Sequence, residues 1–97
     1  METKIQAIHF DIAESLTSFI NKKTDKLARK HVNITEVAAT LKVVKPETAM
    51  NKEARLSVAI PQHDDIVATK TADTFEEAID LCIAAIEPQL EKLKDKK

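Results

Sequence analysis

Residues 34–45 read ITEVAATLKVVK, a stretch in which apolar and polar side chains alternate. Every second residue from Val37 to Val43 is apolar, which is typical of a strand with one buried face. The same alternation returns in residues 55–60 and 65–72, and the turn between these two segments contains proline and aspartate. The region from 34 to 72 therefore predicts an antiparallel meander of strands.

The segment before the meander has helical spacing. Its apolar residues recur every three or four positions, so we expect a helix over residues 12–30. Asp11 is a good N-cap, and Glu14 three residues later completes an arrangement that resembles a capping box. We expect His31 or Asn33 to end the helix. Because the chain has no glycine, Asn33 is the residue expected to adopt a left-handed conformation there.

The segment after the meander predicts a second helix. An apolar stripe runs through residues 75–93, and Asp73 or Thr74 is expected to cap its start. Pro88 interrupts this segment and removes one backbone hydrogen bond. Since the apolar stripe resumes in register after Pro88, we predict one bent, continuous helix rather than two short ones.

An N-terminal strand completes the predicted fold. Residues 3–10 read as a strand, so the order of elements is β-α-β-β-β-α and the fold class is α+β, in one domain over residues 1–97. Each helix has one apolar stripe, so both should pack on one face of a four-stranded sheet. The side chains expected to be buried there are Leu16, Phe19, Ile79, Ile83, Ile86 and Leu90.

The composition excludes several classes of protein. Aromatic residues make up 3 % of the chain, which argues against recognition of single strands by base stacking. Cys82 is the only cysteine, so no intrachain disulfide can form. No apolar run approaches the roughly 20 residues of a membrane span, and the N-terminus does not read as an export signal. We therefore expect a cytoplasmic protein that is monomeric in solution and does not bind membranes.

The net charge of −1 conceals a local basic surface. Salt screens charges beyond about 8–10 Å, so a cluster of cations can act on its surroundings although the total charge is near zero. Lys22, Lys26 and Arg29 fall together on one flank of the first predicted helix, and Lys23 and Lys30 lie nearer its apolar edge. The alternative interpretation is an ordinary solvated flank, with basic residues favoured near a helix C-terminus by the dipole.

The end of the second predicted helix is also basic. Lys92 and Lys96 fall on its outward face, in line with Ala85 and Pro88. These lysines either extend a basic groove or form a solvated lysine-rich tail.

No arrangement of residues predicts catalysis or metal binding. His9, His31 and His63 are scattered, and none has a second metal-ligand residue three or four positions away on a predicted helix. Cys82 lies on an apolar stripe, where a thiol is usually inert packing. A chain without glycine also lacks the close backbone approach that phosphate loops need. We therefore expect no enzyme activity, no cofactor, no metal and no small-molecule substrate.

Local motifs along the chain carry a family resemblance. Residues 9–20 (HFDIAESLTSFI) lead from the first strand into the first helix, and residues 39–45 (ATLKVVK) lie in the second strand. Residues 78–80 (AID) and 89–96 (QLEKLKDK) lie in the second helix. In this order and spacing, the motifs resemble the short form of the ribosome hibernation-promoting factor and ribosome-associated inhibitor family. The resemblance covers residues 5–97.

The resemblance implies a function and a set of contact residues. Short members of this family occupy the decoding region of the small ribosomal subunit, inhibit translation and promote ribosome hibernation under stress, without catalysis. Their contacts are mainly from basic side chains of the two helices to rRNA phosphates. Carried over to this sequence, the rRNA-binding residues are Lys22, Lys23, Lys26, Arg29, Lys30, Lys92, Lys94 and Lys96.

The chain departs from the family in the middle of the second helix. Family members usually carry Lys or Arg on its outward side, whereas this chain has Ala85 and Pro88 next to Glu87. One alternative is therefore a divergent paralogue that acts as a protein-interaction or regulatory module without binding rRNA. A double-stranded RNA-binding domain is another alternative, but Glu76 and Glu77 would repel the phosphates that this module contacts.

Overall fold

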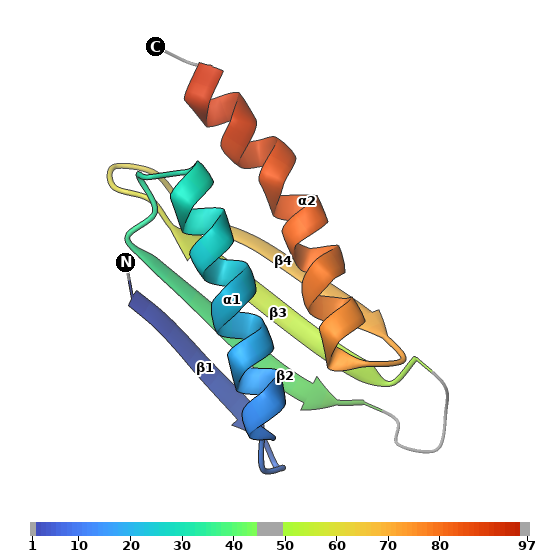
Figure 1. Cartoon of the computed structure of the whole chain (residues 1–97). Helices are drawn as coiled ribbons and strands as arrows, with labels where there is room; N and C mark the ends of the chain where they lie inside the picture. The colour runs from blue at the N-terminus through green and yellow to red at the C-terminus, as the bar shows by residue number, and fades with distance from the viewer. Residues whose placement is uncertain (1, 45–49, 96–97) are drawn as a thin grey trace.

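The computed structural model describes residues 2–44 and 50–95. Its elements follow the predicted order, with helices and strands that Figure 1 shows as two layers. They are β1 (Glu2–Ile8), α1 (Glu14–Lys30), β2 (Glu36–Val43), β3 (Lys52–Ala59), β4 (Ile66–Ala72) and α2 (Phe75–Asp95).

The four strands form one mixed sheet whose spatial order is β1-β2-β3-β4. β2, β3 and β4 pair antiparallel, which confirms the predicted meander. β1 pairs parallel with β2, and α1 supplies the crossover that a parallel pair requires. In this register Ile5 pairs with Ala39 and Leu56 pairs with Ala68, so the apolar residues of neighbouring strands face the same side of the sheet.

Both helices cover the same face of the sheet, as predicted. Figure 1 shows α1 over β1 and β2, and α2 over β3 and β4. The core lies between the helices and the sheet, because one face of each strand and one side of each helix are apolar. The largest fully buried side chains are Ile20, Leu41, Leu56, Ile79, Ile86, Val37, Val58, Thr24 and Cys82.

The burial prediction is wrong for Phe19 and Ile83, which are only partly buried. Phe19 lies at the side of α1, where the Lys23 Nζ atom is 5.3 Å from the centre of its ring. Ile83 packs against the core at its edge and also lines the cleft between the two helices. The prediction is confirmed for the other four side chains, which are Leu16, Ile79, Ile86 and Leu90.

The start of α1 corrects the predicted cap. The helix begins at Glu14 rather than at Ile12, and Ala13 rather than Asp11 occupies the N-cap without a side-chain cap hydrogen bond. The Thr17 hydroxyl donates a hydrogen bond of 3.4 Å to the Ala13 carbonyl oxygen. The Asp-x-x-Glu spacing is therefore present in the sequence but does not form a capping box.

A tertiary contact explains this later start. The Phe10 ring stacks on the Phe75 ring at the beginning of α2, with 5.1 Å between centroids. His9 has a left-handed backbone with φ of 63°, which turns the chain at the end of β1. Residues 9–13 connect β1 to α1. Because the chain turns at His9 and the Phe10 ring is held against Phe75, this segment lies outside the helix.

The end of α1 lies at His31, one of the two predicted residues. The His31 N–H donates a hydrogen bond of 3.0 Å to the Leu27 carbonyl oxygen. The prediction of a left-handed backbone at Asn33 is wrong. Among the residues that the structure describes, positive φ angles occur at His9, Met50 and Gln62.

The start and the continuity of α2 agree with the sequence. The Thr74 hydroxyl accepts a hydrogen bond of 3.1 Å from the Glu77 N–H, so Thr74 is the cap. Asp73 instead accepts a hydrogen bond of 2.7 Å from the Met50 N–H. α2 continues through Pro88 to Asp95, as predicted. Neither helix in the described ranges combines the length and the apolar character that crossing a membrane requires.

Candidate nucleic-acid interface

Lys22, Lys26 and Arg29 form an exposed row along α1, here called the basic stripe, and Lys26 also lines the cleft between the two helices. Residues three and four apart are neighbours on a helix surface, and these three line one shallow surface hollow together with Asp25. Within the described residues, none of the three side chains forms an ion pair with an acid of the chain. The basic stripe is therefore open to an external anion.

The other two basic residues predicted to bind rRNA on α1, Lys23 and Lys30, are partly exposed and form ion pairs with acids of α2. The Lys23 Nζ atom lies 3.3 Å from an Asp80 carboxylate oxygen, and the Lys30 Nζ atom lies 3.4 Å from a Glu87 carboxylate oxygen. Both pairs line the cleft between the helices. Exposed ion pairs of this kind contribute only about 0.2–1 kcal/mol, so a phosphate can compete for either lysine.

Lys92, near the end of α2, does not join the basic stripe. Lys92 is exposed and lines a hollow with His63 and Ile66, on the β4 side of α2 and away from α1. Lys94 lies in the last turn of α2, and Lys96 lies outside the described residues. The described part of the chain therefore places Lys92 on a different surface from the basic stripe.

The predicted outward face of α2 is also corrected in part. Pro88 is exposed, whereas Ala85 is partly buried against the core. A longer side chain at residue 85 would therefore displace packed neighbours, and residue 88 is the open position on this side of the helix.

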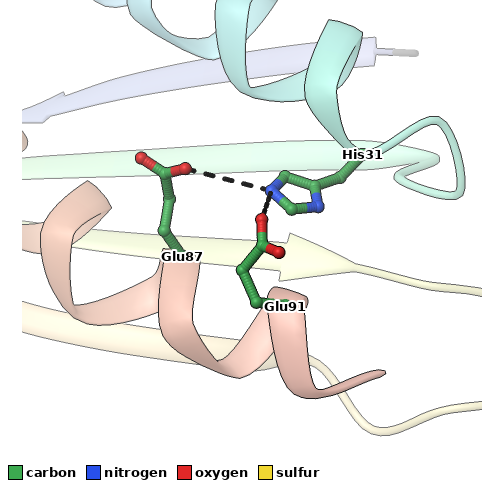
Figure 2. Close-up of side chains that lie close together, drawn as sticks. All are labelled: His31, Glu87 and Glu91. Atoms are coloured by element: carbon green, nitrogen blue, oxygen red, sulfur yellow. Dashed lines mark ion pairs between the residues drawn. The ribbon is translucent and has the colours of Figure 1, made fainter. Parts of the chain in front are cut away.

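A cluster between the helices was missed by the sequence reasoning. The His31 side chain is 5 % exposed, and its Nε2 atom lies 3.9 Å from Glu87 Oε2 and 3.6 Å from Glu91 Oε1. Figure 2 shows both carboxylates of α2 pointing toward this ring nitrogen. The available signal was the spacing of Glu87 and Glu91, which puts them on one side of a helix. The histidine itself is distant in sequence.

The Cys82 thiol is part of the core. Its single S–H is shared between two carbonyl oxygens, with the Sγ atom 3.3 Å from that of Ala54 and 3.5 Å from that of Ala68. Burial raises the pKa of this thiol, so it remains protonated and is a poor nucleophile.

The family comparison decides where this chain belongs. Residues 3–97 match the model of the family described as Sigma 54 modulation protein / S30EA ribosomal protein. The chain belongs to this family. Membership makes it a ribosome-associated factor of the hibernation-promoting group, in agreement with the resemblance seen in the sequence. A comparison with curated protein sequences found no match.

Solved structures show the same fold. The chain superposes on a ribosomal subunit interface protein from Coxiella burnetii with a TM-score of 0.85 and 23 % identity, covering 99 % of this chain and 100 % of that one. It superposes on the Protein Y N-terminal domain from Thermus thermophilus with a TM-score of 0.70 and 18 % identity, covering 93 % and 94 %. At these identities the likeness establishes the fold.

Proposed function

We propose that this protein binds the small ribosomal subunit in the cytoplasm and occupies the decoding region, where it blocks translation and promotes hibernation under stress. The basic stripe carries the proposal, since its three exposed cations have no acid partner among the described residues. Membership of a ribosome-associated family supports rRNA phosphates as the proposed partner of these cations. The mechanism is steric occupation held by phosphate contacts, with no catalytic step.

Lys23 and Lys30 have a secondary part in this proposal. Their pairs with Asp80 and Glu87 are solvent-exposed, and an rRNA phosphate can replace either acid at little cost in stability. In the free protein the two acids lower the positive potential of the cleft. We therefore expect the basic stripe to make the first contacts with the ribosome. Lys92 extends the interface only where the ribosome reaches the β4 side of α2.

A regulatory module without rRNA binding is the second candidate function. It is favoured by the two ion pairs across the cleft and by the uncharged Ala85 and Pro88 on α2. A protein partner does not require a positively charged binding surface, whereas binding in an rRNA channel does.

The test is cosedimentation with small ribosomal subunits over a series of salt concentrations. Replacing all three residues of the basic stripe by alanine should flatten the slope of log affinity against log salt by about 2–3 units, at about 0.7–0.9 per phosphate contact. The matched control replaces Lys4, Lys42 and Arg55 by alanine, which removes the same charge from exposed positions on the uncovered face of the sheet.

The outcomes separate the two candidates. Loss of binding in the basic-stripe variant, with the control unchanged, supports the rRNA interface. Equal pelleting of parent and both variants at every salt concentration contradicts it and favours the regulatory module.

A further inference from the structure

The cluster of His31, Glu87 and Glu91 contains a buried polar atom without a partner. The His31 side chain is more than nine-tenths buried, and its Nε2 atom has no hydrogen-bond partner among the described residues. Buried polar atoms in native proteins are nearly always paired, so this nitrogen requires an explanation. It points at two carboxylates, as Figure 2 shows, rather than at apolar side chains.

The fold holds the three side chains together from two separate elements. His31 ends α1 and is fixed by its backbone hydrogen bond to Leu27. Glu87 and Glu91 are one turn apart on α2, so both carboxylates reach the same side of that helix. One ligand atom from each of the three residues can be chosen so that all lie within 4.8 Å of one another.

The distances suit a small divalent cation after a slight closure. Bond lengths of about 2.0–2.2 Å in tetrahedral geometry place neighbouring donors roughly 3.3–3.5 Å apart. The Nε2 atom lies 3.6 Å and 3.9 Å from the two carboxylate oxygens and the three donors lie within 4.8 Å of one another, so the carboxylates need to move by up to about 1 Å. The carboxylates can make this movement because Glu87 is 32 % exposed and Glu91 is 55 % exposed.

The chemistry of the donors selects the class of metal. One imidazole nitrogen and two carboxylate oxygens suit Zn²⁺ and similar first-row ions, whereas Ca²⁺ and Mg²⁺ prefer all-oxygen sites. Two carboxylates and a neutral imidazole also balance a charge of +2. The exposed side of Glu91 leaves room for water as a fourth ligand.

We propose that His31, Glu87 and Glu91 bind Zn²⁺ and thereby join the C-terminal end of α1 to α2. Lys30 competes for this site, because its Nζ atom lies 3.4 Å from Glu87 Oε2. The oxygen that pairs with Lys30 is also the one that lies 3.9 Å from His31 Nε2, so metal binding requires Lys30 to leave this oxygen or the Glu87 carboxylate to turn its second oxygen toward the metal. The proposal is independent of rRNA binding.

The experiment titrates metal-free protein with ZnCl₂ by calorimetry and by competition with a chromophoric chelator. We expect one Zn²⁺ per chain and a melting temperature that rises with zinc concentration. Glu91→Gln should weaken binding by at least about tenfold, since even second-shell changes weaken metal sites by about 10–100-fold. Glu91 is exposed, so this variant should fold, and circular dichroism of the metal-free form checks that it does.

Control variants locate the metal. His63→Gln and Glu76→Gln change exposed residues of the same types elsewhere and should bind zinc like the parent. Lys30→Met should tighten binding by up to about fivefold, because it removes the competing cation from Glu87. A purely structural role for the cluster would not produce that gain.

Two results would overturn the proposal. One is a parent that takes up no zinc at concentrations up to the millimolar range, which would leave the cluster as a contact between His31 and two carboxylates. The other is equal zinc affinity in Glu91→Gln, Lys30→Met and the parent, which would place the metal elsewhere on the chain.

Discussion

Asp80→Asn is expected to strengthen ribosome binding by releasing Lys23. The two side chains form an ion pair of 3.3 Å at the cleft between the helices, with exposed fractions of 41 % for Lys23 and 52 % for Asp80. At the dielectric constant of water, opposite charges at this distance attract by about 1 kcal/mol. Removing the acid therefore favours a competing phosphate by up to about fivefold in affinity at low salt.

The salt dependence gives an independent readout of the same change. One additional phosphate contact should steepen the slope of log affinity against log salt by about 0.7–0.9. Cosedimentation with small ribosomal subunits, or fluorescence anisotropy with labelled subunits, measures both quantities. Stability should fall by less than about 1 kcal/mol, because the lost pair is exposed.

Glu76→Gln is the matched control for this prediction. This variant removes one negative charge from the first turn of the same helix. Among the described residues, Glu76 forms no ion pair with a lysine. If Asp80→Asn and Glu76→Gln steepen the slope equally, the effect is one of net charge and the reasoning about Lys23 is wrong. If neither changes the slope, Lys23 makes no phosphate contact.

Two further predictions concern packing and the second helix. Ile86→Ala should lower the free energy of unfolding by about 2–5 kcal/mol because Ile86 is fully buried, and Ile83→Ala should cost less; equal losses in chemical denaturation would contradict the assigned faces of α2. Pro88→Ala should stabilise the protein by up to about 3 kcal/mol by restoring helical hydrogen bonding, and Pro88→Arg should add a steeper salt slope for ribosome binding. Equal salt slopes for these two variants would show that residue 88 lies outside the interface.

The elements of the fold were predictable because their signals are local. A period of two in residues 34–72 and the apolar stripe of residues 75–93 depend only on nearby side chains, and the structure confirms both. The start of α1 was predicted wrongly for the opposite reason. Asp11 has the chemistry of a cap, but the stacking of Phe10 on Phe75 links positions far apart in the chain and overrides it.

The candidate sites depend on how the two helices lie beside each other. The exposure of Lys22 could be inferred from a helical projection, but the partners of Lys23 and Lys30 could not. Each lysine meets an acid 57 positions later, which is the offset expected when α1 and α2 run side by side in the same direction. The same placement brings His31 to Glu91. Sequence spacing within one helix carries no information about this offset.

The position of β1 has a consequence for the dynamics of the protein. Among the described strands, β1 lies at an edge of the sheet and pairs only with β2, whereas β2 and β3 each have two neighbours. Its partner residues lie 34 positions further along the chain, as in Glu2 and Glu36, so the pairing forms only after a long loop closes. Local unfolding that begins at β1 breaks a single ladder of hydrogen bonds and leaves the meander intact. The helix that carries the basic stripe thus lies beside an edge of the sheet where we expect faster exchange of amide protons than in the central strands β2 and β3.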